Sequence, residues 1–383
     1  MLKLGVIGYG TRINTIVKLL VNSGEVKLAA VMDVDTDAVK EKYIEPNGFE
    51  NVNYYTDAEK MLENEKLDGI CIGTRCSLHT HYAMLVAKYN IPLFLEKPVC
   101  TTYKDLDRLK SIPHMNDKTV VSFPLRLSNV CSYVKSIVDS GRLGEITHVQ
   151  AYNNVTYGRG YFHLWYRNDS ETGGLFLQKS THDLDYINYL LGDIKPVRVC
   201  AMESKQIYKG DKPAGLKCVD CVERETCRES DINVKKLKDG RRIGEYCCFA
   251  IDTGNHDSGS MLIEYDNGLH VVYSQNFIVR SGAGKRGARI IGYDGTLEFD
   301  WNTSTVTVYD HFNNTTDIKV LAKTDGHGGG DELLSDDFIS VMKGEGKSHS
   351  PLSEGILSAE LCLAARKSAE NNVFVDIKKG AKF

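Results

Sequence analysis

Short apolar runs alternate with amphipathic segments throughout the first 124 residues, and this pattern constrains the fold more than any other feature of the chain. The apolar runs are Leu4–Gly8, Val26–Met32, Val52–Tyr55, Gly69–Ile72, Leu93–Leu95 and Thr119–Phe123. Between these runs lie segments whose apolar residues have helical spacing, such as Ile13–Leu20, Thr80–Tyr89 and Lys104–Ile112. Buried strands that alternate with helices predict a parallel, doubly wound sheet with right-handed crossovers.

The pattern changes near Pro124, where longer stretches of alternating polar and apolar residues begin. They are Ile146–Asn153, Val197–Glu203, Ser260–Tyr265, Leu269–Phe277, Ala288–Tyr293, Thr296–Phe299 and Thr305–Tyr309. Alternation predicts a large, mostly antiparallel open sheet with one face solvated or covered by a partner. Helices are expected at Val130–Val138, Leu175–Leu191 and Ile356–Glu370. We therefore predict an α/β domain over residues 1–124 and an α+β domain over residues 125–383.

Charge and composition exclude several classes of partner. The 383 residues carry a net charge of −4, from 47 basic and 51 acidic side chains, which is too balanced for a nucleic-acid or anionic-membrane surface. No apolar run reaches the ~18 residues of a membrane span, and the N-terminus lacks the features of a signal peptide. Eleven cysteines in such a chain favour reduced thiols, so we expect a cytoplasmic protein.

A glycine-containing turn, Gly8-x-Gly10, follows the first predicted strand and opens the first helix. Such glycines let the backbone approach a pyrophosphate, which the helix N-terminus attracts. The third glycine of the dinucleotide fingerprint is replaced by Ile13, so the fingerprint is partial. Asp33 ends the second predicted strand, where a carboxylate binds the adenine ribose and repels a 2′-phosphate. This predicts NAD rather than NADP; the alternatives are a turn without a ligand and a helix N-cap at Asp33.

Glu96-Lys97-Pro98 stands where the predicted strand Leu93–Leu95 ends. Ligands of open α/β sheets bind outside the carboxyl ends of the strands. A lysine held there can meet both a nicotinamide and a substrate hydroxyl, which indicates a dehydrogenase. The alternative is a lysine at the start of a helix that pairs with Glu96.

Further motifs follow one another in a fixed order through most of the chain. They are Gly8-Tyr9-Gly10, Leu78-His79, Glu96-Lys97-Pro98, Arg126, Gly141-Arg142-Leu143-Gly144-Glu145-Ile146, Trp165, Gly173-Gly174, His182-Asp183-Leu184-Asp185, Gly292-Tyr293-Asp294-Gly295 and His327-Gly328-Gly329-Gly330-Asp331. In this order and spacing the chain resembles the Gfo/Idh/MocA oxidoreductases, named for glucose–fructose oxidoreductase and inositol dehydrogenase. The resemblance implies a Rossmann domain and a substrate domain. It also implies NAD(P)-dependent oxidation of a hydroxyl carbon in a sugar, cyclitol or derivative, and a homodimer or homotetramer joined through the open sheet face.

The resemblance also implies roles for individual residues. Lys97 would bind the reacting hydroxyl, and His182 would be the general base or its partner. Hydride leaves a carbinol carbon only as the hydroxyl proton departs, so an imidazole with a pKa near 7 suits the reaction. A core histidine bonded to Asp185 is the alternative. The expected cofactor-binding residues are Gly8, Gly10, Thr11, Arg12, Asp33, Thr74, Arg75, His79, Glu96, Lys97 and Arg126.

The chain departs from the family pattern four residues before His182. Many members carry an aspartate there, whereas this chain has Gln178, followed by Lys179. Helical spacing would place Gln178, His182 and Asp185 on one face. Lys179 could replace the missing acid or base, or lower the pKa of His182 by charge repulsion. Because some relatives with rearranged motifs cleave glycosides with a bound NAD, by transient oxidation and elimination, this is an alternative function. A non-catalytic nucleotide-sensing regulator is a third.

Aromatic and arginine side chains precede this helix, including Trp165 and Arg167. Aromatic faces and guanidinium groups suit sugar rings and their hydroxyls, so we expect Trp165, Arg167 and Asp185 to bind substrate. Aromatic residues at such positions are equally often core or interface residues.

Five cysteines cluster in a polar segment at about residues 210–250, which reads as an insertion. Cys218-x2-Cys221-x5-Cys227 is followed by Cys247-Cys248. This spacing is typical of a structural zinc site, and we expect Cys218, Cys221, Cys227 and Cys247 as ligands, with Cys248 the alternative to Cys247. Free thiols and disulfides are the other readings.

Overall fold

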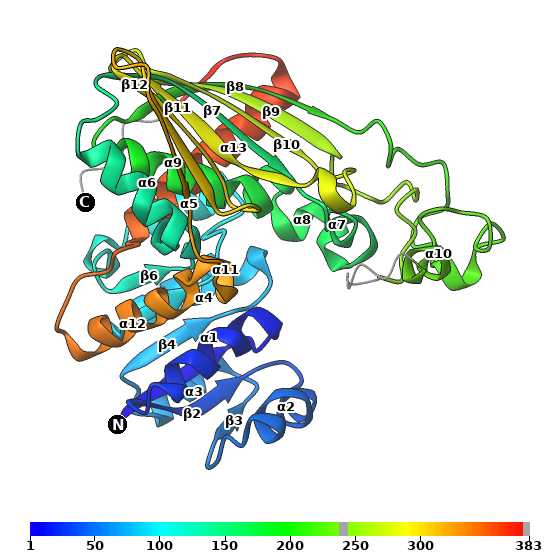
Figure 1. The fold of residues 1–383 in the computed structure, drawn as a ribbon. Helices are drawn as coiled ribbons and strands as arrows, with labels where there is room; N and C mark the ends of the chain where they lie inside the picture. The colour runs from blue at the N-terminus through cyan, green and yellow to red at the C-terminus, as the bar shows by residue number, and fades with distance from the viewer. Residues whose placement is uncertain (237–243, 378–383) are drawn as a thin grey trace. The chain divides into compact units, whose positions relative to one another are not determined.

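The computed structural model describes residues 1–236 and 244–377, which form two compact units (Figure 1). The first unit comprises Met1–Asn129 and Thr324–Glu360, and the second comprises Val130–Lys323 and residues 361–377. The chain thus returns to the first unit after it has built most of the second. The predicted boundary after residue 124 and the insertion at about 210–250 stay predictions. In the described part of the chain, no helix is both long and apolar enough to cross a lipid bilayer.

The first unit is built on a six-stranded parallel sheet with the order β3-β2-β1-β4-β5-β6. The strands are β1 (Leu2–Ile7), β2 (Val26–Met32), β3 (Asn53–Tyr55), β4 (Gly69–Ile72), β5 (Leu93–Leu95) and β6 (Thr119–Val121). The predicted doubly wound sheet is therefore confirmed. The strand order reverses between β1 and β4, and the carboxyl ends of strands at such a point form a ligand-binding crevice.

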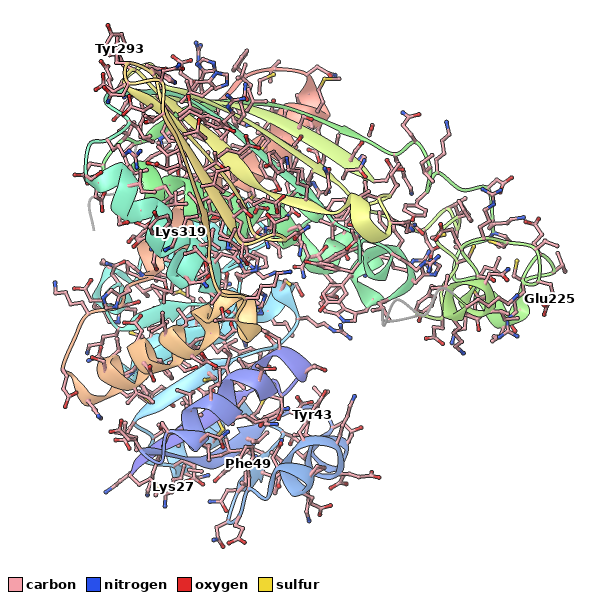
Figure 2. The ribbon with its side chains drawn as sticks, in the orientation of Figure 1. Lys27, Tyr43, Phe49, Glu225, Tyr293 and Lys319 are labelled. Carbon is pink, nitrogen blue, oxygen red and sulfur yellow. The ribbon has the colours of Figure 1, made fainter. Side chains whose placement is uncertain are left out.

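Helices complete the first unit on both sides of this sheet. They are α1 (Thr11–Asn22), α2 (Thr36–Val39), α3 (Ala58–Asn64), α4 (His79–Tyr89), α5 (Tyr103–Lys110), α11 (Asp325–Gly328), α12 (Gly330–Lys343) and the first part of α13 (Leu352–Asn371). The sequence pattern did not predict α12, whose Leu334, Phe338 and Met342 are buried in the main core beside Val6. Tyr43 and Phe49, labelled in Figure 2, pack against the same core.

The second unit is built on a nine-stranded sheet with the order β14-β13-β12-β11-β7-β10-β9-β8-β15. Among the described strands of this sheet, only β7 and β10 pair in parallel, so the predicted, mostly antiparallel sheet is confirmed. The strands are β7 (Ile146–Asn154), β8 (Pro196–Ser204), β9 (Ser258–Tyr265), β10 (His270–Asn276), β11 (Lys285–Gly292), β12 (Gly295–Asp300), β13 (Thr305–Asp310), β14 (Thr316–Val320) and β15 (Val375–Asp376). Burial alternates along β9 and β10, so one face of the sheet is buried and the other is more exposed.

The helices of the second unit lie on the buried face of the sheet or in its loops. They are α6 (Asn129–Asp139), α7 (Gly160–His163), α8 (Asp169–Thr172), α9 (Thr181–Leu191), α10 (Asp231–Lys235) and the last part of α13. The single helix predicted for Leu175–Leu191 is wrong in detail, because Phe176–Ser180 forms a π-helical turn before α9. A π turn adds a residue to the repeat, so α-helical spacing does not extend from His182 back to Gln178.

Candidate functional site

The turn after β1 needs glycine at Gly8 but not at Gly10. Gly8 has a φ of +77°, and a Cβ there would lie 2.4 Å from Thr74 Cγ2 and 2.8 Å from the Thr74 backbone. Gly10 has a φ of −101°, and its Cβ would meet no protein atom closer than Gly73 O at 4.0 Å. Folding therefore explains Gly8, whereas the free space at Gly10 suits the close approach of a ligand.

The first helix begins at this free space. In the described chain no side chain caps α1, and its first turn holds no acidic residue. The first backbone N–H groups of a helix have no partner within the helix, and its dipole favours an anion at this end. With Gly10 as the N-cap, the turn can bind the pyrophosphate of a dinucleotide.

The missing third glycine has a structural counterpart on the neighbouring strand. In the dinucleotide fingerprint this glycine allows close packing of helix on strand. Here a Cβ at Gly73 would lie 2.7 Å from Ile13 Cβ and 2.9 Å from Gly8 O. The small residue is therefore at the end of β4, and α1 packs closely in spite of Ile13.

Asp33 lies at the end of β2 beside the glycine turn. Its Oδ2 accepts a hydrogen bond from the Tyr9 amide at 2.7 Å, and its Oδ1 accepts one from the Asp35 amide at 3.2 Å. The N-cap of α2 is Asp35, not Asp33, so the N-cap reading of Asp33 is wrong. The carboxylate is held where a ribose bound at the switch point would meet it.

Arg12 joins α1 to the loops after β5 and β6 and to α12. Its Nε donates to Glu96 Oε1 at 3.2 Å, and its Nη2 donates to Ser122 Oγ at 3.2 Å and to Asp331 Oδ1 at 2.7 Å. His327 Nδ1 lies 2.9 Å from the other oxygen of Asp331. Burial disfavours the Asp331 carboxylate, but the hydrogen bonds from His327 and Arg12 outweigh burial and hold its pKa well below the usual range. Arg12 thus fixes the loop that carries Glu96.

Lys97 follows Glu96 on this loop and is half-buried. Its surroundings are fixed by His79, whose Nδ1 lies 2.7 Å from Pro98 O and whose Nε2 lies 3.2 Å from Thr74 O. Burial lowers the pKa of His79, and the hydrogen bonds to the carbonyls of Pro98 and Thr74 oppose this shift. Burial raises the pKa of Cys76 to about 11, and the Lys97 charge opposes this shift, which places the lysine near Cys76.

The other predicted cofactor residues of the first unit lie in two environments. Thr11 and Arg75 are exposed at the openings of α1 and of the turn before α4, where a ligand can reach them. Arg126 is buried and donates from Nη1 to His349 O at 2.9 Å and from Nη2 to Glu354 Oε2 at 3.2 Å. The structure therefore gives Arg126 a positioning role within the first unit.

In the second unit, Gln178, Lys179, His182 and Asp185 are all buried in the π turn and in α9. Lys179 Nζ donates to the hydroxyl of Tyr157 and lies 4.4 Å from the centre of its ring. π-helical turns are frequent at functional sites. The half-exposed Tyr157 is one of the aromatic residues that precede the helix in the sequence, and the structure adds its contact with Lys179.

Asp183 is a residue that the predicted set lacked. It is fully buried and accepts hydrogen bonds from Asn153 Nδ2 at 2.8 Å, Tyr273 hydroxyl at 2.9 Å and Arg286 Nε at 2.8 Å. One carboxylate thus joins α9 to β7, β10 and β11. This network fixes the start of α9, where His182 lies.

The predicted substrate residues Trp165 and Arg167 lie in one short turn with different surroundings. Trp165 stacks on Tyr166 with ring centres 3.9 Å apart. Arg167 is buried and donates from Nη2 to Asp252 Oδ1 at 2.5 Å and to Thr253 Oγ1 at 2.8 Å. Trp165 is half-buried, and its role in substrate binding stays a prediction, whereas Arg167 holds the 252–253 segment.

The predicted zinc ligands lie around one small cavity. Cys218, Cys221, Cys227 and Cys247 all line it, together with His163 and Cys248. Among the described residues, one group of His, Cys, Asp or Glu has ligand atoms within 4.8 Å of one another, and it is His163, Glu229 and Cys248. Sequence spacing did not single out His163 or Glu229 as ligands.

Comparison with known families decides the membership of this chain. The NAD-binding Rossmann fold of the oxidoreductase family matches residues 2–123, and the C-terminal alpha/beta domain of that family matches residues 135–377. The chain belongs to the Gfo/Idh/MocA oxidoreductase family. The predicted family and the predicted Rossmann domain for NAD are confirmed.

The chain is similar to several oxidoreductases with different names. "Putative oxidoreductase YteT" of Bacillus subtilis is 28% identical over 321 residues, which are 73% of this chain and 74% of that protein. Myo-inositol 2-dehydrogenase of Thermotoga maritima is 26% identical over 196 residues, 50% of this chain and 55% of the enzyme. The chain thus spans about half the length of the inositol dehydrogenase. Levoglucosan dehydrogenase, solved with NADH and levoglucosan, has a TM-score of 0.79 at 16% identity over 99% of this chain and 100% of that one, which shows a shared fold.

Proposed function

We propose that this protein is an NAD-dependent dehydrogenase that oxidises a hydroxyl carbon of a sugar, a cyclitol or a derivative. The observation that carries the proposal is the set at the β1–α1 turn: an uncapped helix N-terminus, free space at Gly10 and a fixed carboxylate at Asp33. These features fit a dinucleotide without a 2′-phosphate. NAD, when bound, supplies the hydride acceptor of the reaction.

The chain's own residues would bind the substrate and move its proton. We assign Lys97 to the reacting hydroxyl and His182 to the proton, since an imidazole and an amine are the bases available in the predicted set. Lys179 and Gln178 orient the substrate, and Trp165 offers a ring face. Names of relatives, inositol dehydrogenases and levoglucosan dehydrogenase, support a polyhydroxylated substrate.

A second function is favoured by one specific observation. The 2,7-anhydro-N-acetylneuraminate hydratase of Escherichia coli is 22% identical over 175 residues, 44% of this chain and 47% of that enzyme. This chain also has Gln178 at a position where an aspartate is expected. Transient oxidation followed by elimination would use the same cofactor and leave its redox state unchanged at the end of each turnover.

Three further properties belong to the proposal. The protein is cytoplasmic, since its eleven cysteines suit a reducing compartment. It is a homo-oligomer, and exposed apolar side chains on the open sheet, such as Met202, Ile318 and Val320, support this. Its domains are residues 1–124 and 125–383.

We propose that one zinc ion binds among the thiolates of Cys218, Cys221, Cys227 and Cys247. The four thiols line one small cavity together with His163 and Cys248. A zinc ion would fix a segment that lacks a large core of its own.

A substrate panel tests the proposed reaction. Purified protein is incubated with sugars, cyclitols and anhydrosugars, each with NAD and with NADP, and absorbance of the reduced nicotinamide is followed. We expect reduction with NAD and at least one member of the panel. Glycoside cleavage or hydration without net cofactor reduction would support the second function, and no product of either kind would reject both.

A further inference from the structure

The small cavity of the second unit can hold a single ion or water molecule. Its volume is about 20 Å³. Side chains far apart in the sequence meet there: His163 from α7 and the five cysteines of the 218–248 segment. Glu225, labelled in Figure 2, lies in the same segment.

His163 presents a lone pair without a partner. Its Nδ1 lies 2.7 Å from Tyr246 O, and because a carbonyl only accepts, Nδ1 carries the hydrogen and Nε2 carries the lone pair. His163 is 2% exposed, and within the described chain its Nε2 is buried without a hydrogen-bond partner. Metal-binding histidines commonly donate their other N–H to a backbone carbonyl, as His163 does.

The chain holds this imidazole close to the cysteines. Tyr246, which binds His163 through its carbonyl, directly precedes Cys247, and its own amide donates to His163 O at 3.2 Å. A Cβ on Gly244 would lie 2.0 Å from His163 O, so the 244–247 segment packs tightly on the histidine. Two hydrogen bonds between His163 and Tyr246 thus hold the imidazole beside Cys247.

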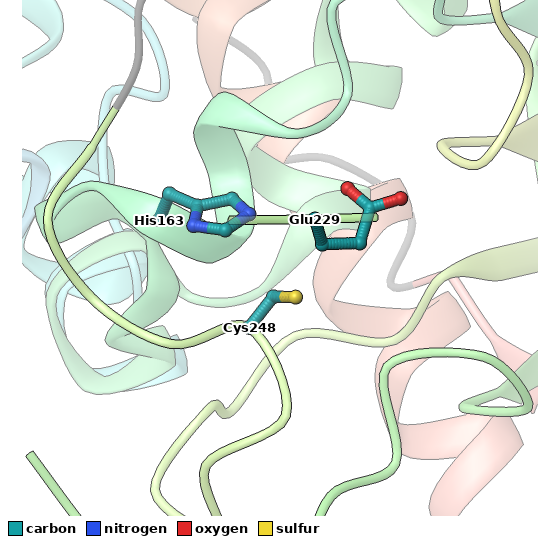
Figure 3. A group of neighbouring side chains, drawn as sticks. All are labelled: His163, Glu229 and Cys248. Carbon is teal, nitrogen blue, oxygen red and sulfur yellow. The ribbon is translucent and has the colours of Figure 1, made fainter. Parts of the chain in front are cut away.

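The groups nearest to His163, which are Glu229 and Cys248, already have other contacts. Figure 3 shows the imidazole facing Glu229 and Cys248, with ligand atoms within 4.8 Å of one another. Glu229 is already paired, since it accepts from Arg159 at 2.6 and 2.9 Å and from Arg280 at 3.1 Å. Cys248 packs in an apolar cluster with Phe162, Tyr208 and Phe277.

We propose that His163 Nε2 is a ligand of the zinc ion, together with three of the four thiolates of Cys218, Cys221, Cys227 and Cys247. The inference rests on the proposed zinc site and adds the nitrogen ligand that the cysteine spacing did not reveal. Four ligands of this kind make a closed structural site. Zinc would satisfy the lone pair of His163 and tie α7 to the cysteine-rich segment.

X-ray absorption at the zinc edge on the full-length protein tests this directly, because it needs no variant. We expect about one zinc per chain, three sulfur neighbours at ~2.3 Å and one nitrogen at ~2.0–2.1 Å. A zinc ion with four sulfur neighbours overturns the role of His163 and keeps the zinc site. Protein purified without added metal that holds no zinc, and binds none when zinc is supplied, rejects both.

Three variants give a second test through zinc affinity, measured by competition with a chromophoric chelator. His163→Gln should lower the affinity for zinc at least ~10-fold, which is the loss expected even for a residue that only supports a ligand. His270→Gln, an exposed histidine on β10, and Cys248→Ala should keep wild-type affinity. Unchanged affinity in His163→Gln, or loss of zinc in Cys248→Ala, contradicts the assigned ligand set.

Discussion

Alanine at Gly10 should weaken NAD binding and leave the fold intact, whereas alanine at Gly8 should destabilise the fold. At Gly8, the left-handed backbone costs an alanine ~1–2 kcal/mol, and the contact at 2.8 Å with the Thr74 backbone adds an overpacking cost. We expect a total loss of about 2–4 kcal/mol in the free energy of unfolding. At Gly10, φ is ordinary and the added methyl has room, so the unfolding free energy should stay within about 1 kcal/mol of wild type.

Chemical denaturation measures the two stabilities, and calorimetry measures NAD binding. Gly10→Ala should raise the Kd for NAD at least ~10-fold, which is about 1.4 kcal/mol of binding free energy. Gly24→Ala is the control, because Gly24 has the same φ of +77° with no atom within 4 Å of the added Cβ. It should lose only the backbone cost, and its difference from Gly8→Ala gives the cost of the Thr74 contact. Wild-type NAD affinity in Gly10→Ala would refute the assignment of the pyrophosphate to this turn.

Three other predictions follow from single side chains. Asp33→Ala should narrow the preference for NAD over NADP, as measured by calorimetry with both cofactors; equal binding in the wild type would contradict the role of Asp33. Lys97→Ala and His182→Ala should each lower kcat ~10²–10⁴-fold. The kcat of the double variant should be little lower than that of the slower single variant, because groups that act together are not additive. A fully additive loss would show that the two residues act in separate steps. Burial raises the pKa of Glu203 to about 7, and the charge of Arg366 opposes this shift. The free energy of unfolding of the wild type should therefore fall as pH rises from about 4.5 through 7, and Glu203→Gln should remove that fall. An equal fall in the variant would contradict the role of Glu203.

Strands of the first unit could be predicted with accurate bounds where the chain is buried on both faces. Val26–Met32, Gly69–Ile72 and Leu93–Leu95 are short apolar runs between turn residues, and the structure gives them the same limits. Helix α12 could not be predicted in this way. Its burial depends on the return of the chain to the first unit more than 200 residues later, which no local pattern records.

The candidate site shows the same division. The Gly8-x-Gly10 turn and Asp33 carry local signals, and the structure brings them side by side. The compensation of Ile13 by Gly73 and the hydrogen bond of Arg12 to Asp331 each join distant segments, and His163 lines a cavity with cysteines of the 218–248 segment. Such pairs follow from tertiary packing, so only a structure reveals them. The π turn at Phe176–Ser180 likewise breaks a regular pattern that the sequence alone would extend.

Transfer of deuterium from substrate to cofactor tests the proposed dehydrogenase most directly. A substrate identified from the panel is labelled at the carbinol carbon and incubated with NAD, and the reduced nicotinamide is analysed by mass spectrometry. We predict one deuterium in each reduced nicotinamide, formed in equal amount to the oxidised product, and a rate at least ~100-fold lower with Lys97→Ala. Product that forms while the deuterium stays in it and the cofactor shows no net reduction would contradict a dehydrogenase and support transient oxidation instead.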